Sequence, residues 1–174
     1  MRREQYLDIT AWAEHTSLFP DSPIHGSVHW RAVTAQAIWL CDAYNLSSEH
    51  RLAALLFGAF HDCRRHNEHY DPDHGQRAAD ALENHPIFQQ LSLGLRETLI
   101  ESLILHDGGQ TTNDSLMGLG WDADRSLLGR VGMIPEHSYF SVVPAGHFDH
   151  FIKVGEGRHF KAPDWDILWA MAKI

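Results

Sequence analysis

Two segments of helical length are apolar on nearly every side, and they constrain the fold more than any other feature of the chain. They span residues 26–44 and 50–63, and the second contains the run LAALLFGAF. A surface helix shows one apolar stripe, whereas a helix that is apolar all round is buried. We therefore place these two helices inside the molecule, and the second at its centre.

The remaining pattern predicts a mainly α protein. Further helices are expected at 3–19, 74–84, 93–106, 114–129 and 164–173, and the polar segment 64–73, which contains Pro72, is expected to be a loop. Beyond Val131 the helical period is lost, and weak strand signals occur at Tyr139–Val143 and His150–Val154. A chain of 174 residues is the size of one domain. We expect a single all-α domain over 1–174, a bundle of five or more core helices at about 20–132 with an irregular C-terminal extension at about 133–174.

Charge and composition exclude several classes of function. A formal charge of −9 argues against general nucleic-acid binding, which needs a basic face. An anionic substrate is still compatible if the site supplies its own positive charge. Two cysteines are too few for a disulfide framework, the start MRREQYLDIT has no signal-peptide pattern, and the apolar run 52–60 is too short to span a membrane. The expected location is therefore cytoplasmic.

The adjacent pair His61-Asp62 lies where the apolar helix 50–63 ends. A buried carboxylate is costly unless it is paired or bound to metal. Taken alone, the pair is equally typical of a helix end at which both side chains reach solvent.

Other helices repeat this placement of a polar group inside an apolar pattern. The additional residues are His29, His74, the pair His106-Asp107, and Asp122 and Asp124 in WDADRSLLGRVG. Histidine nitrogen and carboxylate oxygen together form the ligand set of zinc, iron, manganese and nickel sites in helical bundles. One shared metal centre explains these coincidences better than several unrelated solvent-exposed helix ends.

The order of these residues resembles the HD superfamily of metal-dependent phosphohydrolases, in which a histidine precedes a His-Asp pair and a final aspartate. In this chain the pattern falls on His29, His61-Asp62 and Asp124, and WDADR followed by LLGRVG looks like the D-A-D-R-L segment of the family. The resemblance covers residues 25–132. It implies an HD-domain-like helical bundle in which these four residues hold a metal ion.

Some members of the superfamily hold two metal ions through two more histidines, and His74 and His106 stand where those are expected. The resemblance then implies one or two divalent ions (Mn, Fe, Ni, Zn or Mg), with Asp62 as the bridge. The implied activity is phosphomonoesterase or phosphodiesterase chemistry on a nucleotide or similar small phosphorylated metabolite, through a metal-activated water.

Residues beside the ligands are candidates for further roles. Arg64, Arg65 and Arg125 are candidates for clamping a phosphate, Asp107 and His66 for protonating the leaving group, and Asp122 for orienting a ligand histidine. For each arginine, an exposed helix end is an equally good interpretation.

The chain also departs from known branches of the superfamily. Members that hydrolyse guanosine tetraphosphate carry a Glu-Asp pair where this chain has Arg65 and His66, and the Gly-Tyr-Pro signature of cyclic-dinucleotide phosphodiesterases is missing. Two other hypotheses stay open: a di-iron oxygenase like the inositol-oxygenase branch, and a non-catalytic domain that senses a nucleotide or metal. The aromatic-rich extension is expected to cover the site or to form a homodimer contact.

Overall fold

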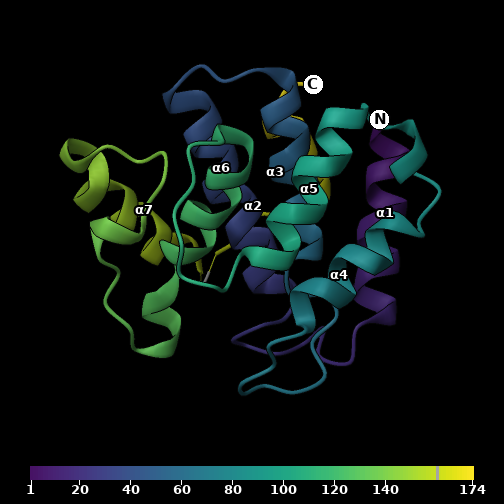
Figure 1. Ribbon diagram of the computed structural model, residues 1–174, viewed down its shortest axis with the longest axis horizontal. Helices are drawn as coiled ribbons and strands as arrows, with labels where there is room; N and C mark the ends of the chain where they lie inside the picture. The colour runs from purple at the N-terminus through teal and green to yellow at the C-terminus, as the bar shows by residue number, and fades with distance from the viewer. Residues whose placement is uncertain (160) are drawn as a thin grey trace.

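The computed structural model describes residues 1–159 and 161–174, and every regular element in that part of the chain is a helix (Figure 1). The α-helices are α1 (Arg3–Thr16), α2 (Ser27–Ala43), α3 (Ser48–Phe60), α4 (His74–Glu83), α5 (Leu93–Leu105), α6 (Ser115–Arg125), α7 (Phe148–His159) and α8 (Trp165–Ala172). The predicted all-α fold class is confirmed. None of the helices described is both long enough and apolar enough to cross a membrane.

Helices α2 and α3 form the centre of the bundle, as the all-round apolar pattern predicts. They pack against each other; α6 and α8 pack against both, and α5 also contacts α3. Their close crossing depends on Gly58, because a Cβ at this position would collide with the side chain of Thr34 on α2. The crossing brings the first turn of α2 next to the end of α3.

Polar side chains fix where three of the helices begin. Ser47 and Ser92 accept hydrogen bonds from backbone N–H groups in the first turns of α3 and α5. Asp114 accepts from the N–H groups of Leu116 and Met117 at the start of α6. These caps satisfy N–H groups that a helix start otherwise leaves without partners.

A second close contact joins α4 to α5. A Cβ at Gly75 would collide with the carbonyl oxygen of Leu103, so a larger residue would separate the two helices. The glycine is therefore needed to hold the first turn of α4 against the last turn of α5, which carry His74 and His106.

The C-terminal extension is helical rather than stranded, and both strand signals were wrong. Residues 150–154 lie inside α7, whose Phe151 is fully buried and accepts a hydrogen bond from Gln36 of α2 through its carbonyl oxygen. Gly155 lies against the same Gln36. Packing on α2 thus stabilises a helix whose glycines lower its intrinsic propensity. Residues 139–143 form the end of a 3₁₀ turn and a bend, which a side chain of α6 holds in place.

Candidate metal centre

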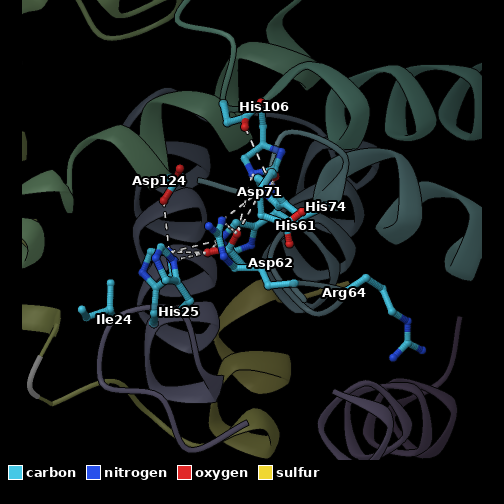
Figure 2. A network of polar contacts seen from close by, with 12 residues as sticks. Ile24, His25, His61, Asp62, Arg64, Asp71, His74, His106 and Asp124 are labelled. Carbon is cyan, nitrogen blue, oxygen red and sulfur yellow. Dashed lines mark hydrogen bonds and ion pairs between the residues drawn. The ribbon is translucent and has the colours of Figure 1, made fainter. Parts of the chain in front are cut away.

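Five helices bring six histidine and aspartate side chains to one place (Figure 2). The six are His29 in the first turn of α2, His61 and Asp62 at the end of α3, His74 at the start of α4, His106 at the end of α5, and Asp124 on α6. The four histidines and Asp62 are at most 4% exposed, and the Asp124 side chain is 14% exposed. All six residues predicted as metal ligands therefore lie together in the interior.

The six side chains form two clusters of three. His29, His61 and Asp124 form the first cluster, and Asp62, His74 and His106 form the second. Within each cluster the potential ligand atoms lie within 4.8 Å of one another. Each cluster thus offers a carboxylate and two imidazoles, which is a ligand set suited to a divalent transition metal.

Backbone carbonyls set the orientation of three of the four imidazoles. The Nδ1 atoms of His61, His74 and His106 lie 3.1, 2.6 and 2.8 Å from the carbonyl oxygens of Gly58, Asp71 and Leu103. A carbonyl oxygen can only accept, so each Nδ1 carries the hydrogen. In the neutral ring Nε2 then presents a lone pair to the cluster, as metal-bound histidines do.

The Nε2 atoms face each other in pairs. His29 and His61 place theirs 3.1 Å apart, and His74 and His106 place theirs 2.9 Å apart. In the second pair both Nδ1 atoms carry the hydrogen, so two lone pairs face each other, and these repel unless a cation lies between them. The spacing is compatible with two nitrogens that share an ion at about 2.0–2.1 Å from each.

The carboxylate of Asp62 faces both clusters. Its Oδ2 lies 3.7 Å from the Nε2 atoms of both His29 and His61. Its Oδ1 lies 3.2 Å from Nε2 of His74 and 3.9 Å from Nε2 of His106. One side chain is thus placed between the clusters, with one oxygen toward each.

The pKa values of the first cluster favour neutral imidazoles. Burial, together with the charge of Arg130, lowers the pKa of His29 to about 3. Burial lowers the pKa of His61 to about 4, although Asp62 opposes this shift. Both rings are therefore unprotonated at neutral pH, which is the form that binds metal.

The second cluster favours a positive charge. Burial acts to lower the pKa of His106, but the hydrogen bond and negative charge of Asp62 outweigh it, and the pKa is raised. Burial likewise opposes ionisation of Asp62, yet His61 and the other neighbouring histidines hold its pKa well below the usual value. A divalent ion would satisfy the same preference for positive charge.

Of the four buried side-chain atoms that have no hydrogen-bond partner in the described part of the chain, two belong to the first cluster. They are Nδ1 of His29 and Oδ1 of Asp124. Oδ1 lies 3.1 Å from Nε2 of His29, but without the geometry of a hydrogen bond. Leaving a buried carboxylate oxygen without a hydrogen bond is costly, and a bound cation would remove that cost for Asp124. The residues therefore fit a metal ion.

Two residues that the sequence pattern did not single out complete the surroundings. His25 places its Nδ1 3.1 Å from Oδ2 of Asp62. Arg130 lies 3.4 Å from Oδ1 of Asp124 and donates to the carbonyl oxygen of Ile24 at 2.9 Å. Although burial opposes it, Arg130 and His29 lower the pKa of Asp124 far below its usual value. The sequence signal for His25 was its position four residues before His29.

Of the three arginines predicted to clamp a phosphate, one points away from the clusters and two lie at the site. Arg64 points away from the clusters: its guanidinium lies 4.6 Å from the ring centre of Trp12 and donates to the carbonyl oxygen of Thr16 (Figure 2). Its expected role as a phosphate clamp is therefore corrected. Arg65 donates to Oδ1 of Asp62 at 3.2 Å, so its side chain belongs to the site. Arg125 reaches the same pocket, where it donates to the carbonyl oxygens of Tyr139 and His106.

Of the two residues predicted to protonate the leaving group, only Asp107 lies at the pocket. Asp107 is 44% exposed, lines the pocket above the clusters, and places Oδ2 3.8 Å from Nδ1 of His74. His66 is exposed and lies outside the lining of that pocket, and its backbone N–H donates to Asp71. His66 begins the bend that follows Arg65, and its side chain is at the surface, so the expectation that it acts as an acid is corrected.

Asp122 does not orient a ligand histidine, and that prediction is corrected as well. Its carboxylate accepts hydrogen bonds from the backbone N–H groups of Ser141, Val142 and Val143, at 2.7, 2.7 and 3.0 Å. Burial raises the pKa of Asp122, although these three donors oppose the shift. The side chain anchors the C-terminal extension to α6.

A pocket of about 580 Å³ opens above the clusters. Asp62, His74, His106 and Asp124 lie along its lining, together with apolar residues of the extension. A second depression, of about 630 Å³, lies along α4 and α5 and contains none of the six clustered residues. The pocket above the clusters is therefore the candidate site for ligand binding and catalysis, and its volume suits a small-molecule ligand.

Fold and site together define an all-helical protein with two facing histidine–aspartate clusters at the floor of a pocket. No family model matches the chain, nor does any curated protein or solved structure. The interpretation of the site consequently depends on its geometry and chemistry.

Proposed function

We propose that this protein is a metal-dependent hydrolase of phosphate esters, similar to the HD superfamily, that acts on a nucleotide or similar small phosphorylated metabolite. The observation that carries the proposal is the position of Asp62, whose two carboxylate oxygens face two separate clusters. A carboxylate between two divalent ions is a common arrangement for displacement at phosphorus.

The clusters would hold the ions with the residues they already bring together. His29, His61 and Asp124 would bind one ion, His74 and His106 the other, and Asp62 would contribute to both. A bound divalent ion supplies a Lewis acid and lowers the pKa of a water molecule, so that a nucleophile exists at neutral pH.

Charge balance at the site favours an anionic substrate. The two carboxylates of Asp62 and Asp124 contribute two negative charges, fewer than the four positive charges of two divalent ions. Arg65 adds positive charge beside Asp62, and Arg130 adds positive charge beside Asp124. The pocket floor would thus attract a phosphate even though the chain as a whole carries a charge of −9.

The leaving group needs a proton, and Asp107 is the predicted acid that lies at the pocket. It is partly exposed, so it can exchange protons with solvent after each turnover. We assign it the role of proton donor to the ester oxygen.

The test is elemental analysis of the purified protein, followed by assays of phosphate release from a panel of mono- and diesters with Mn²⁺, Ni²⁺ or Mg²⁺. We expect one or two transition-metal ions per chain and metal-dependent hydrolysis that falls at least about a hundredfold in Asp62→Ala. Asp8→Ala, a change at an exposed position of α1, is the matched control and should retain full activity.

Other outcomes would point elsewhere. Bound iron together with O₂ uptake and no phosphate release would favour the di-iron oxygenase. Bound metal without turnover of any kind would favour a sensing domain. A metal-free protein unaffected by Asp62→Ala would refute the metal site itself.

A further inference from the structure

The outer part of the pocket is built from apolar side chains, all but one of which (Phe140) lie outside the core. This outer wall consists of Val131, Met133, Ile134, Pro135, Tyr139 and Phe140. Ile134 is 89% exposed and Met133 is 57% exposed. Large apolar side chains grouped at a pocket above polar groups are typical of a surface that a ligand covers.

The outer wall is fastened to the helix that carries a metal ligand. Asp122 holds the backbone of residues 141–143, and Arg125 donates to the carbonyl oxygen of Tyr139 at 2.6 Å. Both side chains come from α6, on either side of Asp124. The distance between the clusters and the end of the outer wall at Tyr139 is therefore set by α6, as a specificity pocket requires.

The charges near the pocket mouth restrict the ligand further. Glu136 lines the pocket and forms no ion pair with an arginine or lysine in the described part of the chain. The guanidinium of Arg125 donates to backbone carbonyls, and those of Arg65 and Arg130 lie beside the ligand carboxylates. Away from the floor, a second anionic group would therefore meet negative charge.

We propose that the substrate carries a single phosphate on an apolar body that lies against the outer wall. This inference depends on the proposed function in that the metal-bound floor takes the phosphate. It adds that Met133 and Ile134 determine which phosphate ester is accepted, and that compounds with a second anionic group on the body are rejected.

The experiment measures binding with phosphonates, which cannot be hydrolysed. Calorimetric titration of the metal-loaded protein compares phenylphosphonate with methylphosphonate, which share the anionic group and differ in the body. We expect phenylphosphonate to bind at least about tenfold more tightly, and Met133→Gln and Ile134→Ser each to remove most of that preference. Methylphosphonate affinity should change less than about threefold.

A control and a charge variant complete the design. Leu93→Ser removes an exposed apolar side chain at the opposite end of α5 from His106 and should leave both affinities unchanged. A ring that carries an additional carboxylate, 4-phosphonobenzoate, should bind severalfold more weakly than phenylphosphonate, and Glu136→Gln should reduce that difference.

The results separate this inference from the proposed function. Equal affinities for the two phosphonates, no binding of either, or a preference that survives both wall variants would overturn the inference, even if phosphate esters are hydrolysed. A preference that depends on Met133 and Ile134 would support it, even if no ester is hydrolysed; in that case the proposed catalytic activity alone would fail.

Discussion

The Nε2 atoms of His74 and His106 lie 2.9 Å apart, although each ring already donates its Nδ1 hydrogen to a backbone carbonyl. Two such nitrogens meet without repulsion only if they share a cation. We expect a metal ion to bind between them.

Metal binding should therefore stabilise the fold. At a free metal concentration about one hundred times the dissociation constant, the free energy of unfolding should rise by about 2.7 kcal/mol. For a domain of this size the melting temperature should rise by roughly 5–10 °C. Thermal unfolding before and after chelation measures the shift. His74→Ala should reduce the rise, whereas an unchanged melting temperature would argue against an interior site.

Acid should destabilise the metal-free protein in the range where His29 and His61 become protonated. Their folded-state pKa values of about 3 and about 4 lie below the ordinary value of 6.5. The unfolded chain consequently binds more protons than the folded chain below pH 6.5, and stability declines as the pH falls toward 4 and then 3. The raised pKa of His106 acts in the opposite direction, but two histidines have lowered pKa values.

Urea unfolding at pH 7 and pH 5 should show a decrease on the order of 1–2 kcal/mol for each of the two histidines. Replacing the exposed His66 with glutamine is the control and should leave the pH dependence intact. Equal stability at the two pH values would contradict the buried neutral state of His29 and His61.

Asp122→Asn should loosen the extension without removing a metal ligand. The amide oxygen is a weaker acceptor for the three N–H groups of residues 141–143, so we expect a loss of about 1–3 kcal/mol in unfolding free energy. Hydrogen exchange should accelerate at residues 141–143. Metal content per chain should be unchanged, and a loss of metal would instead indicate that Asp122 supports a ligand.

The adjacent residues Arg64 and Arg65 form a matched pair. Arg65→Ala removes the positive charge 3.2 Å from Asp62 and should lower phosphatase activity by at least about tenfold. Arg64→Ala removes a contact with Trp12 and should change activity less than about twofold. Steady-state kinetics at saturating metal measures the activity of both variants. Equal losses of activity would contradict the different placements of the two side chains.

The sequence was informative wherever local pattern and burial agreed. The apolar runs predicted α2 and α3, and histidines at their boundaries predicted the clustered side chains, because a polar group inside such a run needs a partner. Helix α7 was missed because its glycines lower its helix propensity, and the packing of Gly155 against Gln36 of α2 is a tertiary contact that no local pattern reveals. His25 was missed because it precedes α2 and reaches Asp62 only through tertiary structure.

Side-chain roles were harder to predict than positions. Arg64 and Arg65 are neighbours in the chain, and the turn after α3 sends them in opposite directions. Asp122 is buried, as a supporting residue should be, but it binds a segment far along the chain. Contacts of this kind depend on how the C-terminal extension folds back onto the helices. What determines that folding is spread over many weak contacts.

The close helix contacts at Gly58 and Gly75 have a consequence for redesign. They set the spacing of the histidines, whereas Met133 and Ile134 above them belong to an irregular segment outside these contacts. Side chains at 133 and 134 should therefore be replaceable in mutant libraries without changing the packing of the interior. Variants with new ligand preferences could then be selected while the rest of the fold stays the same.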